Sequence, residues 1–245
     1  MTPCPECRFD ASAYTLDDVA ATLRTVPDWW TLLTHDRDTT GVAALARRTS
    51  ELVRALPVDA DADQRRALCH DLLHDLHLAG RGLHADGHGV ASHGGVVEQI
   101  NVSGGGVPKT PITSASVGYR GVDGDRQRTR RHHGRVWQAL CLFPSEAIDR
   151  LRADGHPIAA GSVGENLTVR GIDWPALRPN TVVRIGTVVA ELTMPAIPCK
   201  HNARWFTDGD FSRLEHSQHP ADTRWYAAVL VDGEIRPGDA VVVEP

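Results

Sequence analysis

Residues Glu191–Phe206 read ELTMPAIPCKHNARWF, and this stretch separates a strand-like apolar run from a basic segment. Pro195 and Pro198 each fix φ and remove one backbone N–H donor, so neither suits the interior of a hydrogen-bonded sheet. We therefore expect the strand to end before the prolines and a rigid loop to carry Cys199.

The residues that follow Cys199 suggest a chemical role for its thiol. Lys200, His201 and Arg204 are cationic or can become so, and nearby positive charge favours the thiolate, which is the nucleophile and the metal ligand. A free cysteine is also a common packing residue in protein cores. The loop and its cations favour the reactive thiol over the packing residue.

The hydrophobic pattern changes near residue 90. Before it, apolar residues recur at helical spacing in three stripes that begin at Leu16, Val42 and Leu68. Residues 80–95 are rich in glycine and histidine and read as a linker. The sequence predicts an α+β protein, with a small helical bundle in residues 1–90 and a β-barrel in residues 91–245.

Short strand patterns dominate the second part. One helix interrupts them at SEAIDRLRADG, with Ser145 as its cap and Gly155 as its stop. Asp232 and Gly233 form the pair that is typical of a hairpin turn. The predicted strands are 96–102, 136–143, 166–170, 181–185, 187–193, 225–231 and 240–244.

Composition sets limits on location and partners. The 245 residues carry a net charge of −5, which gives no global signal for nucleic acid or membrane binding. No apolar run reaches the roughly 18 residues of a spanning helix, and no signal segment opens the chain. Five cysteines, with only Cys4 and Cys7 close together, favour a reduced, cytoplasmic setting over a disulfide framework.

Two segments of the second part indicate an anion site. NVSGGGVPKTP (101–111) combines three glycines with Lys109, which suits close backbone approach to a phosphate, although glycine runs are also common in turns. GDRQRTRRHHG (124–134) places Arg131 and His133 in a basic cluster within an acidic protein. The cluster is alternatively a solvated loop, and we expect one or two of its arginines to touch a ligand.

A third segment, GSVGENLT (161–168), offers Glu165 and Asn166 at the start of a strand. By itself this pattern is typical of a turn.

Together these segments resemble the MOSC domain, the module found at the C-terminus of molybdenum cofactor sulfurases. NVSGGGVPK, GDRQ with HHG, GENLTV, and PC before a basic segment occur in the family's order over residues 96–245, and they are most similar to the stand-alone bacterial branch that reduces N-hydroxylated bases. The resemblance implies a barrel of strongly bent strands with its site in the cleft. It also implies that Cys199 binds molybdenum or carries sulfur.

The resemblance has departures. Arg135 follows Gly134 where the branch usually has a second glycine, and the helical C-terminal extension of the reductase branch has no counterpart. No pyridoxal-phosphate desulfurase segment is recognisable, so any sulfur chemistry would be independent of pyridoxal phosphate and need a separate cysteine desulfurase.

The N-terminal part carries a second resemblance. CPECRFD at the start and LCHDLLHDLH later are similar to the ends of a DinB-type helical bundle, a family that often binds a divalent metal through three histidines. His70 and His74 have the i, i+4 spacing of two ligands on one helix face, and His77 lies on that face as well. The histidines also lie opposite the apolar stripe, so a solvated face is the alternative.

The sequence therefore predicts an oxidoreductase that uses the molybdenum cofactor (molybdopterin) on small N-hydroxylated or related substrates, with a separate electron donor. Cys199 is the predicted catalytic residue and molybdenum ligand. A sulfur carrier that holds a persulfide on Cys199, and a non-catalytic cofactor- or metal-binding module, are the alternatives. The predicted cofactor-binding residues are Lys109, Arg131, His133, Glu165, Asn166 and Arg204.

Overall fold

The computed structural model describes residues 61, 64, 94–128, 136–179 and 181–244. The predicted helical domain, its DinB resemblance and the border near residue 90 fall almost entirely outside these residues and stay predictions. Asp61 and Gln64 are described, and each backbone N–H donates to the other's side chain, at 3.2 and 2.8 Å. This reciprocal pattern is a capping box, typical of a helix start.

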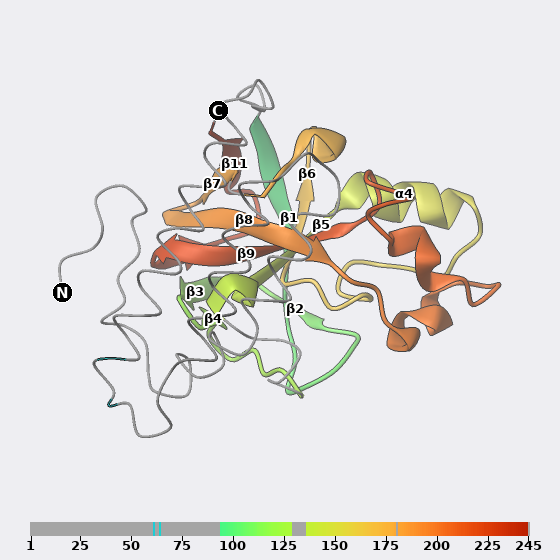
Figure 1. The fold of residues 1–245 in the computed structure, drawn as a ribbon, viewed down its shortest axis with the longest axis horizontal. Helices are drawn as coiled ribbons and strands as arrows, with labels where there is room; N and C mark the ends of the chain where they lie inside the picture. The colour runs from blue at the N-terminus through green and yellow to red at the C-terminus, as the bar shows by residue number, and fades with distance from the viewer. Residues whose placement is uncertain (1–60, 62–63, 65–93, 129–135, 180, 245) are drawn as a thin grey trace. The chain divides into compact units, whose positions relative to one another are not determined.

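A β-barrel forms the centre of the described domain (Figure 1). Within the described residues, one sheet runs in the order β11-β7-β8-β9-β5-β6-β1-β2, and β11 also pairs with β1, so seven strands close into a barrel. Its strands are β1 (Gly94–Val102), β2 (Thr110–Ile112), β5 (Leu140–Pro144), β6 (Leu167–Arg170), β7 (Val182–Ile185), β8 (Val188–Ala196), β9 (Arg224–Val231) and β11 (Ala240–Val243).

The barrel is mixed in strand direction. β5 and β6 pair in parallel, with Leu142 opposite Leu167, whereas the other pairs of this sheet are antiparallel. The parallel pair needs a crossover connection, and α4 (Ser145–Ala153) supplies its helix. The predicted β-barrel is thus confirmed, and the described domain is mostly β.

A smaller sheet accompanies the barrel. Its order is β10-β3-β4, with β3 (Ala115–Gly118), β4 (Gly121–Val122) and β10 (Gly233–Ile235). None of these three strands was predicted, because each is four residues or shorter and leaves little room for an alternating pattern.

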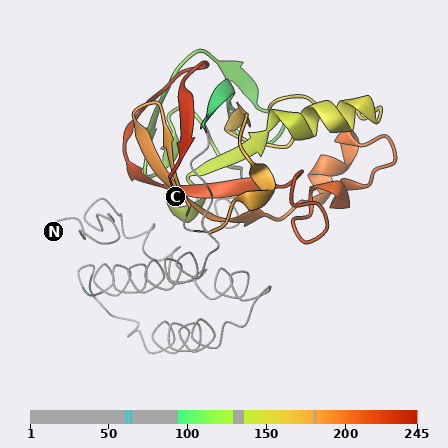
Figure 2. The same ribbon diagram turned by 90° about the horizontal axis from the view of Figure 1, so that it is seen from above.

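Two apolar cores stabilise the domain. The first fills the barrel with side chains such as Ile100, Leu140, Leu167 and Trp225, which are at most 1% exposed. The second lies beside the barrel, where α4 packs with residues that follow β5 and β8, including Phe206 and Leu214. Figure 2 shows α4 beside the orange segment that contains the short 3-10 helices η4 (Lys200–Trp205) and η5 (Phe211–Leu214).

The strand before Cys199 continues further than predicted. β8 runs through Pro195 to Ala196, and Pro195 lies opposite Trp225 of β9. The register shifts between Leu192 and Met194, and such an irregularity is one of the places where a sheet accepts a proline. The expectation of a strand end before Pro195 was wrong, although Cys199 does lie beyond the strand.

The hairpin predicted at Asp232 and Gly233 was also wrong. β9 pairs with β5 and β8, whereas β10 pairs with β3 in the smaller sheet, so the chain crosses between sheets at this point. A Cβ on Gly233 would lie 2.4 Å from Thr187 Oγ1, so close packing accounts for this glycine.

The helix α4 matches its predicted range but not its predicted cap. Pro144 occupies the N-cap position, and the hydroxyl of Ser145 donates instead to Val169 O at 3.0 Å and to Glu98. Gly155 follows the helix with φ of 89°, as a terminating glycine does.

No helix of the described residues is long and apolar enough to cross a membrane. Two further 3-10 helices in the described part of the chain are η2 (Val136–Gln138) and η3 (Trp174–Ala176).

Candidate functional site

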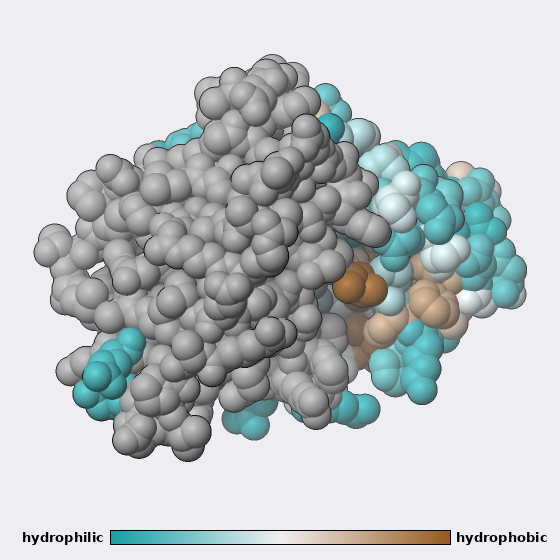
Figure 3. All heavy atoms as spheres, viewed as in Figure 1, coloured by the Kyte–Doolittle hydropathy of each residue, from teal (hydrophilic) through white to brown (hydrophobic). Residues whose placement is uncertain are grey.

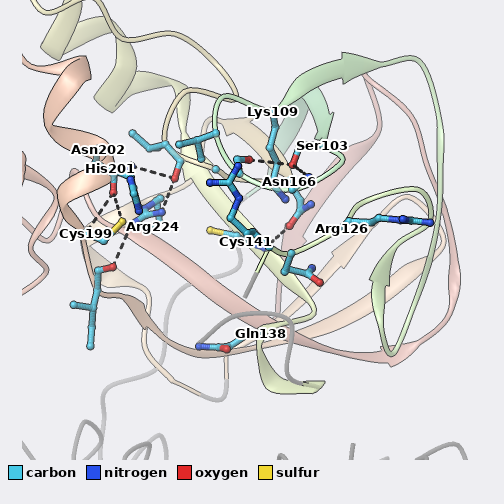
Figure 4. A pocket seen from close by; sticks show the side chains of 18 of the residues that line it. Ser103, Lys109, Arg126, Gln138, Cys141, Asn166, Cys199, His201, Asn202 and Arg224 are labelled. Atoms are coloured by element: carbon cyan, nitrogen blue, oxygen red, sulfur yellow. Dashed lines mark hydrogen bonds between the residues drawn. The ribbon is translucent and has the colours of Figure 1, made fainter. Parts of the chain in front are cut away.

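A cavity of about 530 Å³ opens where four loops and two strands of the barrel meet. Figure 4 shows Cys199, His201, Asn202 and Arg224 on one side of it, and Ser103, Lys109 and Asn166 on the other. The cavity thus brings together the glycine-rich segment, the start of the GENLT segment and the segment after Cys199, which lie far apart in the sequence. This convergence agrees with the site predicted from the motifs.

The lining of the cavity is strongly basic. Among the described residues that line it, none is an aspartate or a glutamate, and His201 adds a further nitrogen ligand or proton carrier. Such a lining attracts anions, because no carboxylate of the wall cancels the positive potential. The lining cations are Lys109, Arg126, Arg128, Lys200, Arg204 and Arg224.

Cys199 lies at the exposed edge of this cavity, immediately before η4. Asn202 holds the loop: its Oδ1 accepts the Cys199 backbone N–H at 3.2 Å and lies 3.7 Å from Cys199 Sγ. The backbone N–H of Asn202 in turn donates to the carbonyl oxygen of Cys199 at 2.9 Å, and the two residues form the pattern of a capping box. Cys199 is therefore both accessible and fixed in position.

The loop of Cys199 is tied to two other walls of the cavity. The Asn202 side chain, 1% exposed, donates to Val163 O at 3.5 Å. Arg204 donates to Val107 O of the glycine-rich segment, and its guanidinium lies 5.1 Å from the centre of the Trp205 ring. Arg204 thus lines the cavity, and part of its donor capacity is used to bridge two loops.

Lys109 reaches the cavity, but its charge is already balanced. Lys109 Nζ lies 2.5 Å from Asp125 Oδ2, and the two side chains are 9% and 1% exposed. Asp125 also accepts hydrogen bonds from the Ser103 N–H at 2.8 Å and from Asn166 Nδ2 at 3.0 Å. The positive charge that remains for an anion therefore comes mainly from the arginines and Lys200.

Asn166 joins the strands behind the cavity. Its Oδ1 accepts the Cys141 N–H at 3.2 Å, and its Nδ2 donates to Asn101 O at 3.3 Å and to Asp125. Both amide hydrogens are used, so one lone pair of Oδ1 is left for a bound group.

Glu165 lies beneath the cavity and not in its wall. Its side chain is fully buried, and Oε1 accepts the Gly161 N–H at 2.5 Å and the Thr168 hydroxyl at 3.1 Å. Burial raises the pKa of this carboxyl group, because the charged form loses its hydration. The structure therefore gives Glu165 a position that supports the loop from Gly161 to Glu165.

Gly105 and Gly106 shape the opposite wall. Their φ angles of 126° and 105° are ones that side chains with a Cβ rarely adopt, so this turn requires glycine. Ser103 closes the turn, with its hydroxyl donating to Gly106 O at 3.0 Å and accepting the Gly105 N–H at 3.3 Å.

Two residues of the cavity were missed or misread in the sequence. Arg224 begins strand β9 and is 6% exposed, and the unusual arginine before WYAAVLV was the available signal. Cys141 is buried, as free cysteines often are, yet it also lines the cavity. Burial raises the pKa of the Cys141 thiol to about 11.

The remaining predicted ligands lie outside the described residues. These are Arg131 and His133 in the basic segment, and His70, His74 and His77 in the N-terminal part. Within the described ranges, no group of three His, Cys, Asp or Glu residues is placed to hold a metal ion.

Comparisons with known proteins agree with the motifs. Residues 129–242 match the family model of the MOSC domain. The chain is 30% identical over 135 residues to the uncharacterized protein YflK of Bacillus subtilis (strain 168), which covers 54% of this chain and 60% of YflK. It is 24% identical over 119 residues to the protein YiiM of Escherichia coli (strain K12), covering 47% of this chain and 52% of YiiM.

A solved structure shows a similar fold. A crystal structure of a hypothetical protein superposes with a TM-score of 0.50 and 18% identity, over 62% of this chain and 68% of the other. The MOSC resemblance is therefore supported for residues 129–242, and the matched region spans only 52–60% of the two curated relatives.

Proposed function

We propose that this protein binds the molybdenum cofactor in the basic cavity and acts as an oxidoreductase on small N-hydroxylated or related substrates. The observation that carries the proposal is an accessible cysteine, Cys199, at the edge of a cavity with six cationic side chains and no carboxylate among its described lining residues. The match of residues 129–242 to the MOSC domain supports the same function.

The residues of the cavity fit the chemistry of this cofactor. Molybdopterin is an anion with a phosphate group, and arginine and lysine side chains are the usual partners of phosphate. A thiolate is a suitable ligand for a soft metal centre, and Cys199 is placed to offer one. Arg126, Arg128 and Lys200 would hold the anionic part, and Arg204 would keep the two sides of the cavity at a fixed separation.

The cofactor and the protein would contribute different parts of the chemistry. When bound, the cofactor supplies two-electron redox chemistry that no side chain of this cavity can supply. The protein orients the substrate, and His201 offers an imidazole at the cavity that can donate or accept a hydrogen bond. A separate electron donor would supply the electrons that the reduction consumes.

The test compares Cys199→Ser with the wild-type chain, each purified from a host that makes the cofactor. We expect the variant to lose bound molybdenum, measured by elemental analysis, and to lose reductase activity on N-hydroxylated bases. Serine keeps the size of the side chain but is a poor ligand for the metal. Cys7→Ser is the matched control, since it removes a thiol of the same chain that the motifs do not place at the cofactor.

The other outcomes separate the alternatives. A mass increase of about 32 Da on Cys199 without molybdenum would indicate the sulfur carrier that receives a persulfide from a desulfurase. Bound molybdenum without any reductase activity would indicate a non-catalytic module. Full molybdenum content and activity in Cys199→Ser would overturn the proposal.

A further inference from the structure

Arg224 is a buried cation without a carboxylate partner. Its Nη1 donates to Val163 O at 2.6 Å and its Nη2 to Ile197 O at 3.4 Å, so both acceptors are backbone carbonyls. The Nε–H has no partner, and no acidic side chain of the described residues forms an ion pair with it. The residue nevertheless lines the cavity.

An unpaired buried guanidinium is costly, because arginine keeps its charge at every pH a protein meets. The carboxyl group of Glu165 is also buried; its Oε1 is used by Gly161 and Thr168, and its Oε2 has no hydrogen-bond partner. Glu165 interacts electrostatically with Arg224, but the two side chains form no ion pair. The positive charge of Arg224 is thus left without a directly contacting carboxylate among the described residues. A bound anion would compensate it.

The position of Arg224 indicates which anion. Figure 4 shows its side chain next to Cys199 and Asn202, on the other side of the cavity from Lys109 and Ser103. The two carbonyl contacts fix the guanidinium and use one hydrogen on each terminal nitrogen, so N–H donors remain for a bound anion, and a carboxylate is a usual partner of arginine.

An apolar group lies at the same edge. Ile197, two residues before Cys199, lines the cavity and is 60% exposed, more than any other large hydrophobic residue described. In the view of Figure 3, the described surface is mainly hydrophilic, with a small hydrophobic group. An exposed isoleucine at a basic cavity suits a ligand with both an apolar body and an acidic group.

We propose that the substrate is a small organic acid whose carboxylate is bound by Arg224, with its apolar body against Ile197 and its reacting group facing Cys199. The proposal rests on the proposed function for the identity of the cavity. Arg224 is a substrate-binding residue in this arrangement. The basic side chains across the cavity are left for the cofactor.

Alkylation of Cys199 tests the arrangement without the cofactor. The full chain is purified from cells that cannot make molybdopterin, and the labelling rate of Cys199 is followed by peptide mass spectrometry with iodoacetate and with iodoacetamide. The two reagents alkylate the thiol through similar carbon atoms, but only iodoacetate carries a negative charge. We expect saturable labelling by iodoacetate, and a fall of about tenfold or more in the iodoacetate-to-iodoacetamide rate ratio in Arg224→Met, the size of one lost charge-assisted contact.

Arg152→Met on the exposed face of α4 is the matched control and should keep the wild-type ratio. A folded Arg224→Met variant with an unchanged ratio would overturn the proposal. Arg224→Met removes the donor to two backbone carbonyls, so its folding must be checked. A second measurement therefore uses the wild-type chain and follows how far an added compound slows the labelling of Cys199. Benzoate should slow labelling by iodoacetamide, and its uncharged analogue benzamide should not.

Equal protection by benzoate and benzamide, or better protection by inorganic phosphate than by benzoate, would overturn the carboxylate assignment. Loss of molybdenum from holo Arg224→Met with an unchanged labelling ratio would assign Arg224 to the cofactor instead. These results are independent of the molybdenum content of Cys199→Ser, so the two proposals can fail separately.

Discussion

The ion pair of Lys109 and Asp125 should be among the most costly contacts of the domain to break. Asp125 accepts three hydrogen bonds, from Lys109, Asn166 and Ser103, and its side chain is 1% exposed. Asp125→Asn keeps the shape and one acceptor oxygen. It removes the charge, and its amide nitrogen cannot accept from Lys109 and Asn166.

The magnitude follows from burial. Removing one partner of a buried pair costs about 3–5 kcal/mol, because the other charge is left without compensation. Lys109 lines a cavity and can gain some contact with water, so we expect the low end of this range, a loss of about 3 kcal/mol in the free energy of unfolding. Urea unfolding followed by tryptophan fluorescence measures this loss.

A double variant isolates the charge. Lys109→Met together with Asp125→Asn should be more stable than Asp125→Asn alone, because no unpaired ammonium remains in the protein. Asp208→Asn is the matched control, since the same chemical change breaks the exposed pair with Arg213 and should cost much less than Asp125→Asn. A loss below about 1 kcal/mol for Asp125→Asn, or additive effects in the double variant, would refute this account of the pair.

Three further predictions concern single positions. The Cys141 thiol has a pKa of about 11 in the folded state and near 9 in the unfolded state. Its contribution to the free energy of unfolding is therefore complete below pH 9 and is lost as the pH rises to about 11. Between pH 8 and 11, the free energy of unfolding of Cys141→Ala should fall less steeply than that of the wild-type chain. Gly161→Ala should destabilise the domain by about 2 kcal/mol or more in urea unfolding, because φ is 83° and the new Cβ would lie 2.4 Å from Lys109 O, and an unchanged midpoint would contradict this backbone geometry. Alkylation of the native chain below pH 8 should label Cys199 and leave Cys141 unmodified; equal labelling would mean that the cavity floor is open to reagent.

The barrel was predictable because its strands carry local patterns of apolar residues. The predicted 225–231 and 240–244 differ by one residue from the observed β9 and β11, and 181–185 differs by one from β7. The strand predicted at 136–143 instead begins at Leu140, after a 3-10 helix. Pro195 and the Asp232–Gly233 pair misled the prediction, because register shifts and crossings between sheets depend on partners that lie far away in the sequence.

The site was predictable as a set of segments but not in its pairings. The motifs placed Cys199, Lys109, Asn166 and Arg204 at one cavity, and the structure brings these residues there. The ion pair of Lys109 and Asp125 could not be foreseen, because the two residues are 16 positions apart in the sequence and come together only in the folded chain. Arg224 was missed because one charge at a strand end is usually a solvated residue.

The closure of the barrel has a consequence for the order of events during synthesis. The seam joins β1 to β11, with Gly94 opposite Val242, and these strands are separated by nearly the whole domain. The ribosome must therefore release almost all of the domain before the first strand finds its last neighbour. The residues that line the cavity run from Ser103 to Tyr226, so a ligand that touches both ends of this range can bind only after most of the domain has been made.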